Sequence, residues 1–169
     1  MAPLSVKERN ARFQAMSRSE QRIAIAQDAL AQLEKGRYNA EHIYCELMEL
    51  PSGNYAEWGD IAGGRRAKCQ VCATGSLLVS AVFLSGKLQA TEDWQDSAGS
   101  VEVVQELKPY FAESELALIE LFYEGKDHLN RNRTLGLHIP GDMRRFAELY
   151  YYEVNDDYRR MAEILNSII

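Results

Sequence analysis

Apolar residues recur at helical spacing in the first part of the chain. Ile23, Ala26, Leu30 and Leu33 follow one another at three- and four-residue steps, which predicts an amphipathic helix. Ser17 followed by Glu20 fits a capping box at its start, and Gly36 provides a stop. Ser5 and Glu8 form a second capping box, so an earlier helix is predicted just before it.

The segment from about residue 69 to residue 84 has a different pattern, because it contains no charged residue. A helix that is apolar nearly all round is buried nearly all round. We therefore predict a buried central helix that begins at the pair Cys69 and Cys72 and ends at Gly86. The apolar run is interrupted by small polar residues and is shorter than the roughly 20 residues that span a membrane.

Residues 38–50 are ambiguous between helix and strand. A helix could start after Asn39, whereas Ile43, Cys45, Leu47 and Glu49 share the parity of one strand face. A small β-hairpin within residues 38–60 is therefore an open alternative. Residues 51–66 are predicted to form a turn and a loop, and Gly63-Gly64-Arg65-Arg66 lacks the spacing of a nucleotide-binding loop.

The second half of the chain predicts four further helices separated by polar segments. Their expected starting residues are Ser100, Ser114, Asp142 and the run Asn155-Asp156-Asp157, and residues 126–141 between two of them are expected to be a loop. On the helix after Asp142, the apolar positions are Met143, Phe146, Leu149 and Tyr150. The predicted fold is mainly α, a single domain over residues 1–169 with six or seven helices around the central one.

Composition supports a globular protein of the cytoplasm. The chain has 169 residues, of which 46% are hydrophobic and 26% charged, and this is enough for one core. We expect no membrane association, because no apolar stretch is long enough. Three cysteines, an odd number, favour a reducing compartment over a disulfide scaffold.

The net charge of −6 is distributed unevenly. Nine acidic residues and one lysine lie in residues 88–125, whereas residues 1–37 hold seven basic residues and four acidic ones. Nucleic-acid binding is not expected, because it relies on positive charge that faces phosphates. Acids on solvated helix faces explain most of this pattern, and an acidic face for a basic partner is the alternative.

The Cys69-x-x-Cys72 pair has three interpretations. Packing is the simplest, since cysteine is a small and usually buried residue. Zinc is the second, because His42 and Cys45 have the same spacing and would complete a Cys3His set. Thiol chemistry is the third, because a helix N-terminus favours the thiolate; a Cys–His nucleophile would need His128 or His138 as its base.

The C-terminal region is rich in tyrosine and arginine, which are enriched at protein interfaces. Three consecutive tyrosines cannot all face one side of a helix, so at least one is expected to be exposed. The residues that we predict to bind a partner are Tyr150, Tyr151, Tyr152, Tyr158, Arg144 and Arg145.

Three stretches together resemble a loose group of small uncharacterised proteins of bacteria and their phages: residues 22–28, the motif Cys69-Gln70-Val71-Cys72-Ala73-Thr74-Gly75, and Asp157-Tyr158-Arg159-Arg160-Met161. The group has no assigned activity, so the resemblance implies no catalytic residues. It implies a phage or mobile-element origin and a host component, such as a defence system, as target.

The prediction from the sequence is a non-enzymatic protein that binds another protein and needs no cofactor; a homo-oligomer is a further option. Two alternatives stay open. One is a zinc-binding or thiol-redox protein centred on Cys69 and Cys72. The other is a sensor of small molecules.

Overall fold

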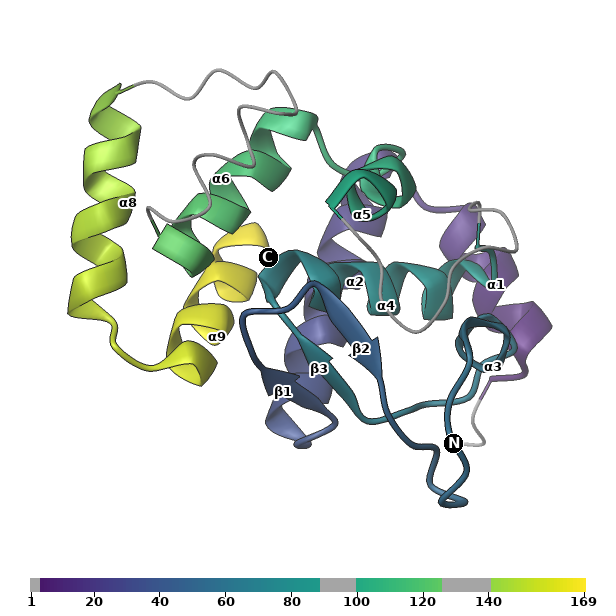
Figure 1. Ribbon diagram of the computed structural model, residues 1–169. Helices are drawn as coiled ribbons and strands as arrows, with labels where there is room; N and C mark the ends of the chain where they lie inside the picture. Colours follow the sequence, from purple (N-terminus) through teal and green to yellow (C-terminus); the bar gives the residue numbers. More distant parts are fainter. Residues whose placement is uncertain (1–3, 89–99, 126–140) are drawn as a thin grey trace.

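The computed structural model describes residues 4–88, 100–125 and 141–169 (Figure 1). Within these ranges it contains eight helices and one three-stranded sheet, which confirms a mainly α fold with a small β element. The helices are α1 (Val6–Gln14), α2 (Arg18–Glu34), α3 (Trp58–Ala62), α4 (Ala73–Ser85), α5 (Ser100–Leu107), α6 (Glu113–Glu124), α8 (Gly141–Glu153) and α9 (Asp157–Ile168). The strands are β1 (Tyr38–Ala40), β2 (Cys45–Leu47) and β3 (Cys69–Val71).

Both predicted capping boxes are present. The Ser5 hydroxyl accepts from the Glu8 backbone N–H, the Ser17 hydroxyl accepts from that of Glu20, and each glutamate reaches back to the N-cap residue. Gly36, in the left-handed region at φ 64°, follows the end of α2 as expected. These helix ends are determined by local hydrogen bonds, so the sequence was sufficient to locate them.

The predicted helix over residues 69–84 is wrong at its N-terminal end. Residues Cys69–Val71 form β3, the central strand of the sheet, which is parallel to β1 and antiparallel to β2. Tertiary pairing on both edges outweighs helix propensity in so short a segment. For the same reason β1 and β2 do not form a hairpin: β3 lies between them.

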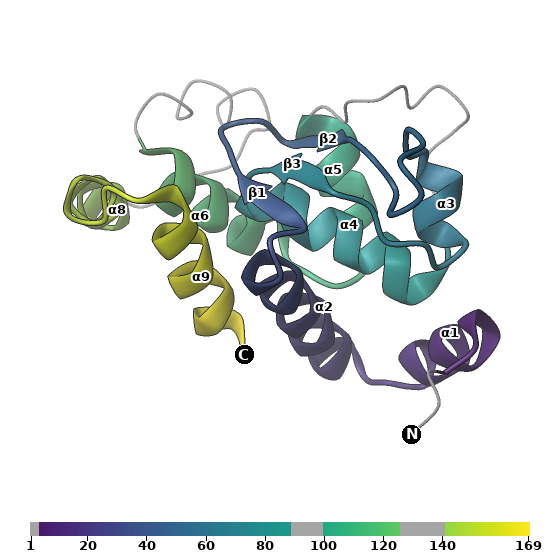
Figure 2. The ribbon, with the colours of Figure 1, turned by 90° about the horizontal axis from the view of Figure 1, so that it is seen from below.

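Helix α4 begins at Ala73, and Cys72 is its N-cap. All but one of its thirteen residues are buried, as expected for an uncharged helix. It contacts α1, α2, α3, α5, α6 and α9, and the sheet lies along one of its sides (Figure 2). Its expected stop is confirmed: Gly86 is in the left-handed region at φ 65°.

Two predicted features around α4 need correction. The expected loop of residues 51–66 contains the short helix α3, whose Trp58 and Ile61 are buried. Helix α6 has Ala112, not Ser114, as its N-cap residue, and the Ala112 N–H donates to the Glu115 carboxylate at 2.8 Å. Gly125 ends α6.

The C-terminal pair α8 and α9 packs against α6 (Figure 1). Asp156 is the N-cap of α9 and its side chain accepts from the Arg159 N–H, so the expected start is confirmed. Gly141 begins α8 and Asp142 lies in its first turn, while the rest of the predicted loop at 126–141 is outside the described residues. None of the helices that the structure describes is long and apolar enough to cross a membrane.

Candidate functional site

The three cysteines are buried and form no disulfide. Cys72 caps α4 through its sulfur, which accepts from the Gly75 N–H at 3.4 Å and lies 3.1 Å from the Thr74 hydroxyl. Burial raises the pKa of the Cys69 and Cys72 thiols to about 12, and it raises that of Cys45 well above its usual value. A protonated, buried thiol is a poor nucleophile, so the local geometry favours packing and capping over thiol chemistry.

The four residues of the proposed zinc set lie in four different elements. Cys69 and Cys72 do not share a helical turn, because Cys69 belongs to β3. Cys45 is buried in β2, whereas His42 lies in the β1–β2 connection with its side chain 43% exposed. Among the residues that the structure describes, no group of three or more His, Cys, Asp or Glu side chains is arranged to hold a metal ion.

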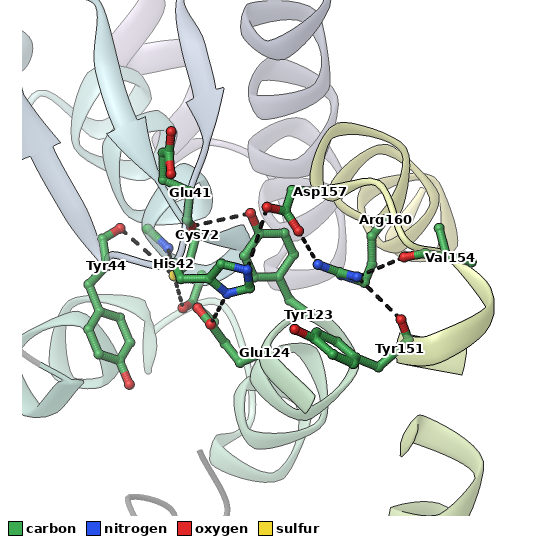
Figure 3. A network of polar contacts seen from close by, with 12 residues as sticks. Glu41, His42, Tyr44, Cys72, Tyr123, Glu124, Tyr151, Val154, Asp157 and Arg160 are labelled. Carbon is green, nitrogen blue, oxygen red and sulfur yellow. Dashed lines mark hydrogen bonds and ion pairs between the residues drawn. The ribbon is translucent and has the colours of Figure 1, made fainter. Parts of the chain in front are cut away.

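His42 instead joins a network of polar contacts between the sheet and the C-terminal helices (Figure 3). Its Nδ1 lies 2.6 Å from the Glu124 carboxylate of α6, and its Nε2 lies 3.5 Å from the Asp157 carboxylate of α9. The Tyr123 hydroxyl donates to the Glu41 carbonyl at 3.2 Å, next to the imidazole. Two helices and one loop are thereby connected through a single histidine.

Arg160 carries the same network to the α8–α9 turn. Its side chain is buried, and its guanidinium donates to the carbonyls of Val154 (2.7 Å) and Tyr151 (3.4 Å) (Figure 3). It also pairs with Asp157, and its charge lies 4.3 Å from the centre of the Tyr151 ring. Buried charges need such partners, so this network holds the end of α8 and the α8–α9 turn to Arg160.

The residues predicted to bind a partner divide into two groups. Tyr152 (72%) and Tyr158 (48%) are exposed, and so is Arg145, which confirms that the three tyrosines do not share one environment. Arg144, Tyr150 and Tyr151 are half-buried. Tyr151 packs on Arg160, and the Tyr150 hydroxyl donates to Glu163 at 2.9 Å while partial burial raises its pKa to about 12.

Helix α8 exposes more apolar surface than its sequence suggests. The pattern of Met143, Phe146, Leu149 and Tyr150 predicts an apolar face, yet Phe146 is 59% exposed and Leu149 55% exposed. The one fully buried residue of α8 is the small Ala147, which packs on α6. Spacing shows that a face is apolar; it does not show whether anything covers that face.

An apolar groove lies between α6, α8 and α9. Its volume is about 430 Å³, and its lining consists of Leu118, Ile119, Phe122, Phe146, Tyr150, Glu163, Ile164 and Ser167. The Phe122 ring meets the rings of Phe146 and Tyr150 edge-on, with centroids 5.8 and 5.5 Å apart. The exposed side of α8 and this groove are continuous through Phe146.

The acidic stretch is less exposed than expected. Glu106, Glu120 and Glu124 are buried, and His42 contacts the last of them. Glu92, Asp93 and Asp96 lie outside the described residues, as do the two candidate base histidines His128 and His138.

Comparison with known proteins does not extend this picture. No protein-family model, no curated protein and no solved structure matches the chain significantly.

Proposed function

We propose that the chain is a non-enzymatic protein that binds another protein through the exposed face of α8 and the adjoining groove. The observation that carries the proposal is the exposure of three large side chains, Phe146, Leu149 and Tyr152, on one helix. They are three residues apart and therefore lie on one side of α8. An exposed apolar patch of this kind marks an interaction site in many proteins.

The groove determines which kind of partner fits. Its walls are three helices, whose backbone groups are already hydrogen-bonded within each helix, so an extended peptide would gain no strand partner there. A partner helix satisfies its own backbone and needs only apolar side chains to fill the groove. We therefore propose an amphipathic helix of another protein as the occupant.

The polar edge of the groove would orient that helix. The Glu163 carboxylate is held by Arg159 at 2.8 Å and by the Tyr150 hydroxyl, and these hydrogen bonds lower its pKa. Arg145 is exposed on the same helix as Leu149. A polar rim around an apolar centre is the usual composition of a protein interface.

The resemblance to small bacterial and phage proteins supports a finer proposal about the partner. A protein of that origin would act on a host component, and a defence protein is one such target. The residues that carry this resemblance are 22–28, 69–75 and 157–161. Of these, only residues 157–161 lie in a helix that borders the groove, namely α9.

A comparison of matched variants tests the proposal. Leu149→Glu and Tyr152→Glu place charge in the centre of the exposed face, and Leu4→Glu places the same charge on an apolar residue exposed to a similar extent, 54%. Tagged wild-type protein would be cross-linked to its partner in lysate of the native host. The captured partner would then be purified, and its affinity for wild type and for each variant would be measured by titration. We expect binding to weaken at least about tenfold for the two α8 variants and to stay unchanged for Leu4→Glu.

Two results would contradict the proposal. One is a captured partner that binds Leu149→Glu and wild type equally. The other is light scattering that shows the wild-type chain to be a dimer which Leu149→Glu converts to a monomer, because a second copy would then cover the face. Tyr151→Ala is not a suitable probe, since Tyr151 packs on the buried Arg160.

A further inference from the structure

Three segments, two of which carry basic residues, meet at one end of the small sheet. Residues 35–37 precede β1 and residues 66–68 precede β3, and these two strands are parallel, so both segments reach the same end. Strand β2 is antiparallel to β3, so the residues after it, 49–53, arrive there as well. The topology brings together segments that are distant in sequence.

A pocket of about 460 Å³ lies between these segments. Its lining contains four cations and a single acid: Lys35, Arg37, Arg66, Lys68 and Glu49. The volume is within the range that binds small molecules, about 300–1,000 Å³. The lining of this pocket is thus positively charged, although the chain as a whole has a net charge of −6.

Two of the four cations are already balanced by carboxylates. Arg66 forms two hydrogen bonds with Asp28 and stacks on Phe83, and Lys68 pairs with Glu49 at 2.9 Å. Neither Lys35 nor Arg37 forms an ion pair with any residue within 4–88, 100–125 or 141–169. Among the described residues, no acid compensates the positive charge on this wall of the pocket.

The local structure holds this wall in position. The Arg37 N–H donates to the Gln32 carbonyl, and its guanidinium donates to the Gln32 side chain at 2.9 Å. The Arg37 carbonyl in turn accepts from the Cys69 N–H at 2.9 Å. The guanidinium is thus partly ordered before any ligand arrives, which reduces the entropic cost of binding.

We propose that this pocket binds a small molecule with two or more phosphate groups. Guanidinium and ammonium groups are the side chains that bind phosphate oxygens most strongly, and arginine can do so through two hydrogen bonds. Two uncompensated cations correspond to a ligand of at least two negative charges. The pocket is concave and local, unlike the extended basic surface that a nucleic acid requires.

Isothermal titration calorimetry at fixed ionic strength would test this inference with four probes. Pyrophosphate and ATP carry linked phosphates, citrate carries comparable charge without phosphate, and adenosine carries the base alone. We expect the first two to bind and the last two not to bind. Tighter binding of ATP would assign the ligand to the nucleotides, and equal binding would assign it to polyphosphate alone.

Variants connect the binding to this pocket. Lys35→Ala and Arg37→Ala should each weaken pyrophosphate binding by about tenfold, the loss expected for one charge-assisted hydrogen bond. Lys108→Ala is the control, because it removes the same charge from the α5–α6 connection. Thermal melts of all three variants would confirm that each is folded.

Several outcomes would overturn the inference. One is that neither pyrophosphate nor ATP binds folded wild-type protein, and another is that citrate binds as tightly as pyrophosphate. Binding could also be unaffected in folded Lys35→Ala. A single-stranded oligonucleotide that binds through Lys35 and Arg37 more tightly than ATP would assign the pocket to a nucleic acid instead. None of these results depends on α8, so they are independent of the proposed protein partner.

Discussion

At the scale of the residue, Gly75 has the strictest requirement for its identity. A Cβ atom at this position would lie 1.4 Å from the Tyr44 carbonyl oxygen, because α4 passes directly against the β1–β2 connection. Its N–H also donates to the Cys72 sulfur that caps the helix. The close approach is to backbone, which cannot rotate away as a side chain could.

We expect Gly75→Ala to reduce the free energy of unfolding by about 3 kcal/mol or more, the upper range for overpacking a core. Gly59→Ala is the matched control: Gly59 is in a helix, and an added Cβ meets nothing within 4 Å. That substitution should leave stability unchanged or raise it slightly. Urea unfolding followed by circular dichroism measures both, and equal stability of the two variants would refute the close contact.

At the scale of the element, α9 carries two neighbouring arginines with different environments. Arg160 is buried between Asp157 and the carbonyls of the α8–α9 turn, whereas Arg159 is exposed and pairs with Glu163 one turn away. Removing Arg160 leaves the Val154 and Tyr151 carbonyls without their side-chain donor, which is costly at a buried site, while an exposed pair contributes little.

Arg160→Ala should therefore destabilise the protein by about 3 kcal/mol, because buried carbonyls lose their donor, and it should loosen the α8–α9 turn. Arg159→Ala should have little effect on stability. Hydrogen exchange would locate the change, with faster exchange in residues 150–157 for the Arg160 variant alone. Similar exchange in both variants would show that the buried network does not hold the turn.

At the scale of the whole molecule, several buried groups make stability depend on alkaline pH. Burial raises the pKa of the Cys69 and Cys72 thiols to about 12, and it raises those of Cys45 and Tyr38 well above their usual values. The folded state thus binds these protons more tightly than the unfolded state does. The stabilisation that the protonated thiols contribute is complete below the pKa of an unfolded thiol, about 8.5. It is lost as the pH rises toward the folded pKa of about 12.

We expect the urea midpoint to fall steadily between about pH 8.5 and pH 10.5, since the unfolded thiols ionise in this range. Cys45→Ala removes one of the titrating groups and should make the fall shallower. The same range also tests whether the buried thiols are unreactive, because alkylation of folded protein should then be slow until unfolding begins. A midpoint that is constant over this range would be inconsistent with protonated, buried thiols.

The sequence by itself determined features that depend on neighbouring residues. Ser5 and Ser17 begin helices because each hydroxyl and the glutamate three residues later satisfy one another's backbone donors. Gly86 ends α4 because its left-handed conformation is open to glycine. The absence of charge over residues 69–84 predicted a buried central helix, since burying a charge is costly.

Only the tertiary structure decided the features that depend on distant partners. Cys69 lies in a strand because β1 and β2, from elsewhere in the chain, supply its hydrogen bonds. Glu124 is buried because His42, 82 residues away, reaches it. Tertiary packing also leaves Leu149 exposed and places Lys35 and Arg66 in the lining of one pocket. Periodicity in the sequence defines a helix face, but only packing decides what lies against that face.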